Sequence, residues 1–205
     1  MKTLETLQLE GNKIVDEKGD AWATWRGDLN LLGQHGLGDL PASRVILWTG
    51  WSGDEPFERH PLTWGPASLD QFRKAIDAAS RAAAETGTTL LLRPHARHVL
   101  ADPQRCLSFF RERADSDRVG LVLDTASMLE ASMVEKVEDH LERAVDALAE
   151  HAAAVWLSDV QTSDTLDALG EPELRRVAPG EGAMGEHLLG TVDRCVPADV
   201  PRIVG

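Results

Sequence analysis

The stretch VGLVLD, residues 119–124, is apolar up to its last residue, which is a carboxylate. A strand of a parallel sheet has this composition, because helices cover both of its faces. Three other runs share the pattern, namely residues 44–48, 89–93 and 154–157. Longer amphipathic runs rich in Ala, Glu and Arg lie between them. This alternation predicts βα units around a parallel sheet, and hence an α/β fold.

The amphipathic runs carry helix signals at their ends. Ser68 is a candidate N-cap for a helix that Gly87 ends, and Asp102-Pro103 starts the next helix. Residues 127–150 and 182–195 predict two more helices, because apolar side chains recur in both at helical spacing.

The first 43 residues are the least legible part of the chain. Residues 4–9 predict a weak strand, residues 11–13 resemble a hairpin tip, and residues 21–32 fit a helix. With a final strand at residues 200–204 the count reaches about six, whereas a closed TIM barrel has eight. Either the first third of the chain holds two further strands, or the barrel is short and incomplete, with an open sheet edge that a homodimer would cover.

The chain has 205 residues and a formal net charge of −13, which fits one domain over residues 1–205. A negative field repels phosphate backbones and anionic membranes, so neither nucleic acid nor a membrane is expected as a partner. There is no apolar signal region and no apolar stretch of about 18 residues. Cys106 and Cys195 show no CxxC or zinc spacing. These features predict a cytoplasmic protein with reduced thiols.

Five motifs occur in a fixed order after residue 43. They are RVILWTG at 44–50, LLLRPH at 90–95, LVLDTAS at 121–127, VWLSD at 155–159 and PGEG at 179–182. Their order and spacing resemble the sugar phosphate isomerase/epimerase group of the xylose-isomerase-like TIM barrels. The resemblance implies a TIM-barrel-like (β/α) barrel whose strand C-termini hold a divalent metal. That metal binds sugar oxygens while paired carboxylates move a proton.

The sequence departs from this family pattern at nearly every metal ligand. Arg93 stands where the resemblance implies Glu, and Ser127 and Trp156 stand where it implies His. Trp48 replaces a His that is sometimes found, and only Asp124 keeps its family place. A divalent ion needs several anionic or imidazole donors, and Arg93 puts a permanent positive charge where the ion belongs. The sequence therefore predicts no family-type metal and no other cofactor.

In the strand register that the family resemblance implies, Trp48, Arg93, Asp124 and Trp156 face inward and form a small-molecule pocket. Arg93 either binds a substrate carboxylate or phosphate, stabilises an oxyanion, or only pairs with Asp124 in the former metal cavity. Trp48 and Trp156 either form the floor for a planar ligand or fill the core.

Other candidate residues follow those strand ends. His95 and His98 are either acid–base groups or surface side chains, and Asp159 is a candidate ligand contact. His60 lies in the long loop of residues 50–61, which is either a lid or a loop packed by its aromatic side chains. The PGEG motif precedes a predicted helix, but Glu181 argues against a phosphate there and favours a tight turn.

The leading hypothesis is a metal-independent isomerase, lyase or cyclase acting on a small anionic or carbonyl-containing molecule. In it Asp124 is a base or orienting group, His95 an acid or base, and Arg93 the contact to the anion. A non-catalytic small-molecule-binding relative, or a subunit of a larger assembly, is the second hypothesis. The third is a metal-dependent sugar isomerase or epimerase whose rebuilt site uses Asp124, His95, His98 or His60.

Overall fold

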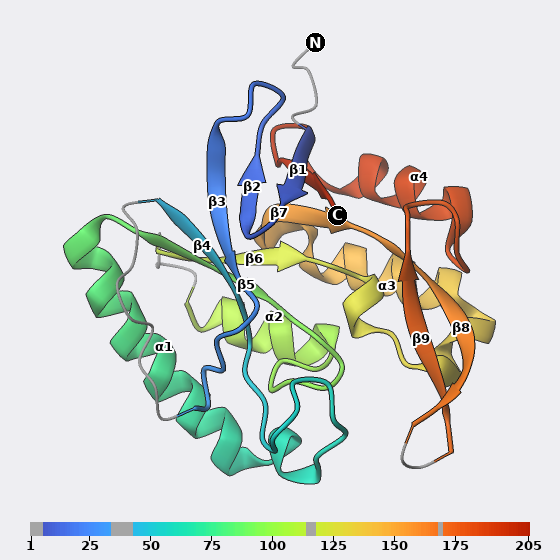
Figure 1. The fold of residues 1–205 in the computed structure, drawn as a ribbon, viewed down its shortest axis with the longest axis horizontal. Helices are drawn as coiled ribbons and strands as arrows, with labels where there is room; N and C mark the ends of the chain where they lie inside the picture. The colour runs from blue at the N-terminus through green and yellow to red at the C-terminus, as the bar shows by residue number, and fades with distance from the viewer. Residues whose placement is uncertain (1–5, 34–42, 114–117, 168–169) are drawn as a thin grey trace.

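The computed structural model describes residues 6–33, 43–113, 118–167 and 170–205, and eight of its strands form a closed barrel (Figure 1). In chain order these strands are β1 (Thr6–Glu10), β2 (Lys13–Val15), β3 (Ala21–Arg26), β4 (Arg44–Trp48), β5 (Thr89–Arg93), β6 (Val119–Leu123), β7 (Ala152–Leu157) and β10 (Arg202–Val204). Neighbouring strands from β3 to β7 are parallel, and β10 lies parallel between β7 and β1. β2 is antiparallel to both β1 and β3 and completes the ring. The predicted α/β barrel is confirmed.

Closure of the ring corrects the expectations for the first third of the chain. The predicted helix at residues 21–32 is wrong, because residues 21–26 pair as β3 with both β2 and β4. The count of about six strands is therefore too low, and each barrel strand described has a partner on both sides. The expected open edge is thus absent from the described barrel, and the homodimer proposed to cover it stays a prediction. The hairpin tip is confirmed at Gly11, whose φ of 63° is left-handed.

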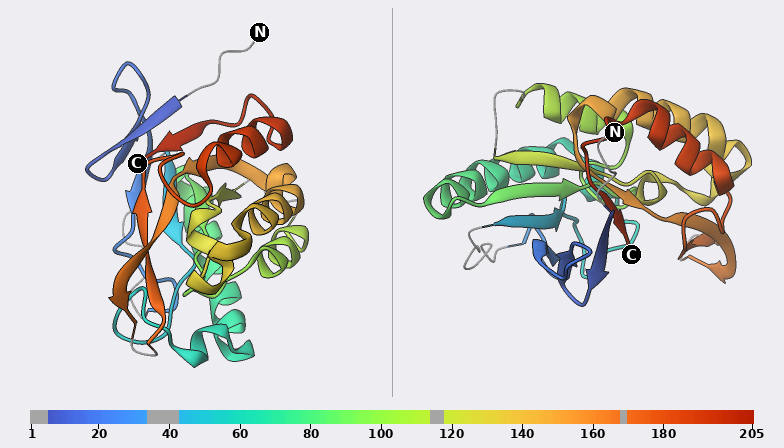
Figure 2. Two further views of the ribbon diagram at one scale, coloured as in Figure 1. Left: turned by 90° about the vertical axis from the view of Figure 1, so that its right-hand side faces the viewer. Right: turned by 90° about the horizontal axis from the view of Figure 1, so that it is seen from above.

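The helices lie together on one side of the barrel, and β1, β2 and β3 have none over them (Figure 2). They are α1 (Pro66–Thr86), α2 (Pro103–Arg111), α3 (Val137–Leu148) and α4 (Gly185–Cys195), with 3-10 turns η1 (Pro61–Trp64), η2 (Ala126–Met128), η3 (Ala131–Lys136) and η4 (Ala149–His151). No described helix is both long and apolar enough to cross a membrane.

The helix signals in the sequence predict where the helices lie more accurately than they predict the first residue of each helix. α1 begins at Pro66 after Gly65 rather than at Ser68, whose hydroxyl donates instead to the Leu62 carbonyl. Asp102 caps α2 as predicted, since its side chain accepts the Arg105 backbone N–H at 2.9 Å. The helix predicted over residues 127–150 is broken into η2, η3, α3 and η4.

A hairpin outside the barrel was not predicted. Strands β8 (Asp159–Leu166) and β9 (Pro172–Val177) pair with each other in antiparallel fashion directly after β7 (Figure 1). Their polar, half-exposed side chains give no apolar run, which explains why the sequence pattern misses them. The hairpin matters because it brings residues of β9 to the mouth of the barrel.

The core has two layers that follow from the alternation of side chains along strands. One cluster fills the barrel interior, and every barrel strand contributes to it: Leu7, Ile14, Ala23, Ile46, Leu91, Val122, Ala154, Trp156 and Ile203. The larger cluster lies between the barrel and the helices and includes Leu47, Leu92, Leu121, Phe72 and Phe109. The interior layer fixes which side chains of each strand face inward.

Candidate functional site

The next inward-facing side chains lie at the C-terminal mouth of the barrel, two residues beyond the interior layer. They are Leu9, Trp25, Trp48, Arg93, Asp124 and Trp156, and Gly205 holds the corresponding position directly after the last strand. All of them except Asp124 line a pocket of about 620 Å³, together with Asn12, Gly27, Asp28, Phe57 and Arg176. The volume is in the range of small-molecule sites, and barrel active sites lie at this end. This pocket is the candidate functional site.

Arg93 lines the pocket and lies among the indole rings of three tryptophans. Its guanidinium carbon is 3.6 Å from the ring centre of Trp156, 4.6 Å from that of Trp48 and 5.2 Å from that of Trp25. Burial lowers the pKa of Arg93 to about 10, and nearby Arg176 contributes in the same direction, while Asp124 opposes both. The side chain therefore stays charged at neutral pH, and cation–π contacts compensate part of its desolvation.

Asp124 pairs directly with Arg93 and is fully buried. Its Oδ2 atom accepts from Arg93 Nε at 2.8 Å, from Arg176 Nη1 at 3.1 Å and from the Ser127 hydroxyl at 2.6 Å. Burial alone would raise the pKa of Asp124, but Arg176, Arg93 and the Ser127 hydroxyl lower it below its usual range. The carboxylate is a permanent anion with its lone pairs engaged, and a poor proton acceptor.

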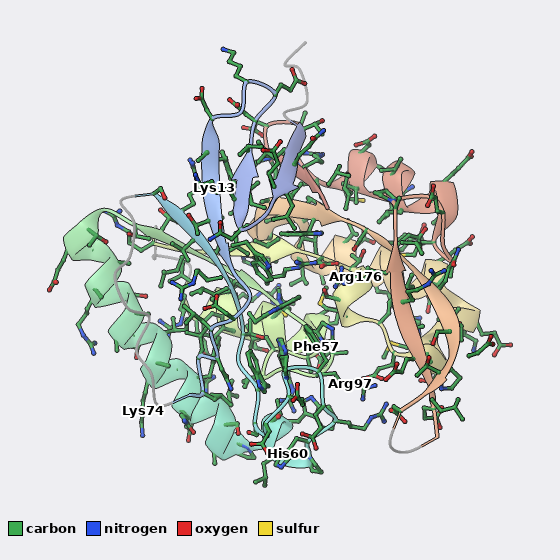
Figure 3. The ribbon with its side chains drawn as sticks, viewed as in Figure 1. Lys13, Phe57, His60, Lys74, Arg97 and Arg176 are labelled. Atoms are coloured by element: carbon green, nitrogen blue, oxygen red, sulfur yellow. The ribbon has the colours of Figure 1, made fainter. Side chains whose placement is uncertain are left out.

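Arg176 is a charged residue of the candidate site that the sequence reasoning missed. It comes from β9, lines the pocket, and donates through Nη1 to Asp124 and, at 2.6 Å, to the Ser158 hydroxyl. Its Nη2 donates to the Ser127 hydroxyl. Figure 3 labels Arg176, which reaches the barrel mouth from the hairpin. No motif marked it, and its partner Asp124 is 52 residues away in sequence.

The predicted histidines pack behind the pocket wall instead of lining it. The ring centres of His95 and His98 lie 5.5 Å and 5.1 Å from Trp48, and 4.7 Å and 5.6 Å from Phe57. His98 is fully buried and makes a 2.7 Å hydrogen bond from Nε2 to the Pro56 carbonyl. Burial, His98 and Arg176 lower the pKa of His95 well below its ordinary value. Both rings are therefore neutral at pH 7.

The loop of residues 50–61 is held by contacts at Pro56 and Arg59. Besides the bond from His98 to Pro56, Arg59 pairs with Glu130 at 3.0 Å, and Arg97 reaches the same carboxylate at 2.9 Å. Phe57 is half exposed and lines the pocket (Figure 3). These contacts describe an ordered loop packed by aromatic side chains, which is one of the two predicted alternatives.

Acidification should destabilise the fold through His98. Burial lowers the pKa of His98 to about 4, against the Pro56 hydrogen bond, which raises it. In the unfolded chain the pKa of His98 is near 6.5. Between pH 6.5 and 4 the imidazole therefore takes up a proton in the unfolded chain but not in the folded chain. Stability should be full above pH 6.5 and fall by about 3 kcal/mol as the pH drops through that window.

Urea unfolding at pH 7.5, 5.5 and 4.5 measures this loss. The variant His98→Gln should show a flatter dependence on pH, with His95 responsible for the slope that remains. An identical slope in the variant and the parent protein would show that His98 does not titrate as its burial requires.

The two remaining predicted residues lie away from the pocket lining. Asp159 is fully buried, and its carboxylate accepts backbone N–H groups of Val160, Gly182, Met184 and Gly185 at 2.7–3.0 Å. It anchors the loop before α4, and the PGEG motif forms the predicted turn. His60 precedes η1, and its carbonyl accepts the Thr63 N–H at 3.0 Å. Of the predicted site residues, the structure thus brings Trp48, Arg93 and Trp156 to the pocket, with Asp124 paired directly with Arg93.

The donor set at the strand ends does not fit a divalent ion. In the described residues no three His, Cys, Asp or Glu side chains converge in a way that could hold a metal. At the position where the family binds its metal, this chain offers one carboxylate, that of Asp124. Two guanidinium groups already pair with this carboxylate. A cation there would have to displace both Arg93 and Arg176. The absence of the family's metal stays a prediction that elemental analysis of the purified protein tests.

Comparison with known proteins agrees with the fold. The sequence profile of the xylose isomerase-like TIM barrel matches residues 37–194. Solved structures with the same fold include a xylose isomerase domain protein from Planctomyces limnophilus (16% identity, TM-score 0.51) and a xylose isomerase-like TIM barrel protein from Mycobacterium smegmatis in complex with magnesium (14%, 0.50). A third is the probable 3-DHS dehydratase AsbF from Bacillus anthracis (14%, 0.53).

These likenesses concern the fold alone. They cover 78%, 78% and 79% of this chain and 50%, 53% and 56% of the respective structures, so the chain spans about half their length. No curated protein matches the sequence. The profile covers more than three quarters of the chain, in the region that carries β4 to β7 and their strand-end residues. The chain therefore belongs to the xylose isomerase-like TIM barrel family.

Proposed function

We propose that this chain binds a small organic anion at the mouth of its barrel without a divalent metal, and that Arg93 is the group that holds the anion. The proposal rests on one observation above all. The Arg93 guanidinium uses Nε and Nη2 on Asp124, at 2.8 Å and 2.6 Å, while its Nη1 has no hydrogen-bond partner among the described residues. Arg93 lines the pocket, so Nη1 is a charged donor available to a ligand there.

Asp124 supports this function by positioning Arg93 rather than by moving a proton. Donors from three side chains engage its Oδ2 atom, and the Ser127 backbone N–H donates to Oδ1 at 3.1 Å. A general base needs an accessible lone pair and a pKa near the working pH. The contacts of Asp124 therefore favour a binding protein over an enzyme that uses Asp124 as its base.

A metal-independent isomerase, lyase or cyclase is the second candidate, and His95 is the observation that favours it. The His95 Nδ1 atom accepts the Arg97 backbone N–H at 3.0 Å, which leaves the ring proton on Nε2. A neutral imidazole that donates from Nε2 is suited to polarising a substrate carbonyl. The ring packs against Trp48 and Phe57, which both line the pocket, so a rearrangement of Phe57 would bring it to a ligand.

The variant Arg93→Lys tests the proposed function. Lysine keeps the charge beside Asp124 but lacks the fork that contacts both the carboxylate and the pocket, so the affinity for organic anions should fall at least about tenfold. Three of the six tryptophans line the pocket, so quenching of tryptophan fluorescence by benzoate or phenyl phosphate reports binding.

The matched control is Arg175→Lys, which changes an exposed neighbour on β9 that contacts Gln161. It should bind either probe as the parent protein does. Thermal unfolding checks that both variants are folded at the assay temperature. Equal affinities in the parent protein and Arg93→Lys would remove Arg93 from the anion site and, with it, the proposal.

A further inference from the structure

The chain contains two groups of hydrogen-bond donors suited to an anion. One of them already binds a carboxylate of the protein itself. The loop before α4 directs the backbone N–H groups of Gly182, Met184 and Gly185 at the Asp159 carboxylate, at 3.0, 2.9 and 2.9 Å. Converging N–H groups at the start of a helix are the usual means of holding a phosphate. Here the side chain of Asp159 is the anion that they hold.

The packing around Asp159 leaves this nest no space for a ligand. Asp159 is fully buried, and Gly182 approaches it so closely that a Cβ atom on residue 182 would lie 2.5 Å from its Oδ1. The same Cβ would lie 2.3 Å from the Val160 carbonyl oxygen. A phosphate would have to expel a buried carboxylate and unwind the loop, so the barrel has no phosphate nest at this position.

The second group of donors is the pocket itself, and its charge matches a single negative charge. Arg93 and Arg176 bring two positive charges, and Asp124 cancels one of them. At the rim Asp28 is paired with Arg26 at 3.0 Å, so this pair adds no net charge. One unit of positive charge remains, which balances a carboxylate but leaves a phosphate monoester, with its charge of about −1.5 to −2, partly uncompensated.

The walls of the pocket determine which kind of group can lie beside the anionic head group of the ligand. Four aromatic side chains, Trp25, Trp48, Phe57 and Trp156, line the pocket, with ring centres 4.9–5.6 Å apart between contacting pairs. Polar groups other than the arginines are few. A polyol would lose hydrogen bonds to water that such walls cannot replace, whereas a flat apolar ring would gain contact area.

We propose that the ligand is a flat monocarboxylate, with an aromatic or unsaturated ring against the indoles and its carboxylate on Arg93 Nη1, and that it is not a sugar phosphate. This inference rests on the proposed function, which requires only that some organic anion binds through Arg93. The carboxylate head group is inferred from the single net positive charge of the pocket and from the backbone N–H groups that Asp159 already occupies. The flat body is inferred from the aromatic walls.

A panel of four matched probes tests the inference by isothermal titration calorimetry at pH 7.5. Benzoate carries both features, phenyl phosphate changes only the head group, benzamide removes the charge, and gluconate keeps the carboxylate on a polyol. Benzoate should bind at least tenfold more tightly than each of the other three. Trp25→Leu should narrow the ratio of benzoate to gluconate affinity. Trp22→Leu, on the same strand but outside the pocket lining, should leave that ratio unchanged.

The outcomes separate the two proposals. If phenyl phosphate binds as tightly as benzoate and loses affinity in Arg93→Lys, the ligand class is wrong and the proposed function stands. If gluconate binds as tightly as benzoate, the proposed flat shape of the ligand is wrong. If none of the charged probes binds at millimolar concentration, both proposals fail.

Discussion

Replacing Asp124 by Asn is expected to lower the free energy of unfolding by about 3–5 kcal/mol, because it leaves the Arg93 guanidinium buried without a counter-charge. The Arg93 side chain is 5% exposed, so water cannot replace the lost carboxylate. Arg176 makes the loss larger, since it is a second positive charge on the same oxygen atom. Urea denaturation followed by tryptophan fluorescence measures the change.

The matched control is Asp139→Asn on α3. Asp139 pairs with Arg143 at 3.0 Å, but the two side chains are 51% and 75% exposed, so the loss should stay below about 1 kcal/mol. The opposite pattern for Asp124→Asn, with unchanged stability and a complete loss of substrate conversion, would establish Asp124 as a catalytic base. It would also overturn the positioning role assigned to it above.

How far the fold could be predicted depended on how each strand is buried. β4 to β7 are covered on both faces, as Val45, Ile46 and Leu47 illustrate with no exposed surface, so they appear as continuous apolar runs. β2 has only three residues and starts with the exposed Lys13, so it has no such run. β3 joins Ala and Trp, which fit either a helix or a strand, and only its pairing with β2 and β4 decides between them.

The candidate site could be predicted only where its residues lie on strands that the sequence pattern reveals. The register of the resembled family placed Trp48, Arg93 and Trp156 at the pocket, and the structure gives the reason: each lies two residues beyond an interior side chain. Trp25 obeys the same rule on β3 and was lost with that strand. Arg176 follows no barrel periodicity, since it arrives on a hairpin whose side chains mostly face solvent. Its role depends on tertiary contacts that a single sequence does not encode locally.

The burial of Asp159 shows why a residue type at the right strand position is not yet a site. An acidic residue directly after a barrel strand resembles a ligand contact in sequence. Its four backbone partners, however, come mainly from residues 182–185, more than 20 positions further along the chain. The loop that satisfies Asp159 also removes it from the pocket, and both effects follow from the close approach of Gly182.

The double variant Arg93→Met/Asp124→Leu should recover most of the stability that either single change loses, and should not bind anions. Met has a volume close to that of Arg, and neither Met nor Leu leaves an unpaired ion; exchanges of buried ion pairs for apolar side chains are often neutral or stabilising by about 1–4 kcal/mol. Arg176 can turn to water, because its side chain is already 36% exposed. Its freedom makes the recovery feasible, although the Ser127 donors lose their acceptor.

A double-mutant cycle with Arg93→Met and Asp124→Leu measures the coupling between the two residues by urea denaturation, and benzoate titration of the same proteins measures binding. A coupling of more than about 2 kcal/mol, together with an affinity at least about 100-fold lower in a stable double variant, is expected. This combination separates the two roles of the pair, because the fold then persists without Arg93 while the anion site does not. Benzoate binding at the parent affinity in the stable double variant would mean that the pair has only a structural role at the barrel mouth.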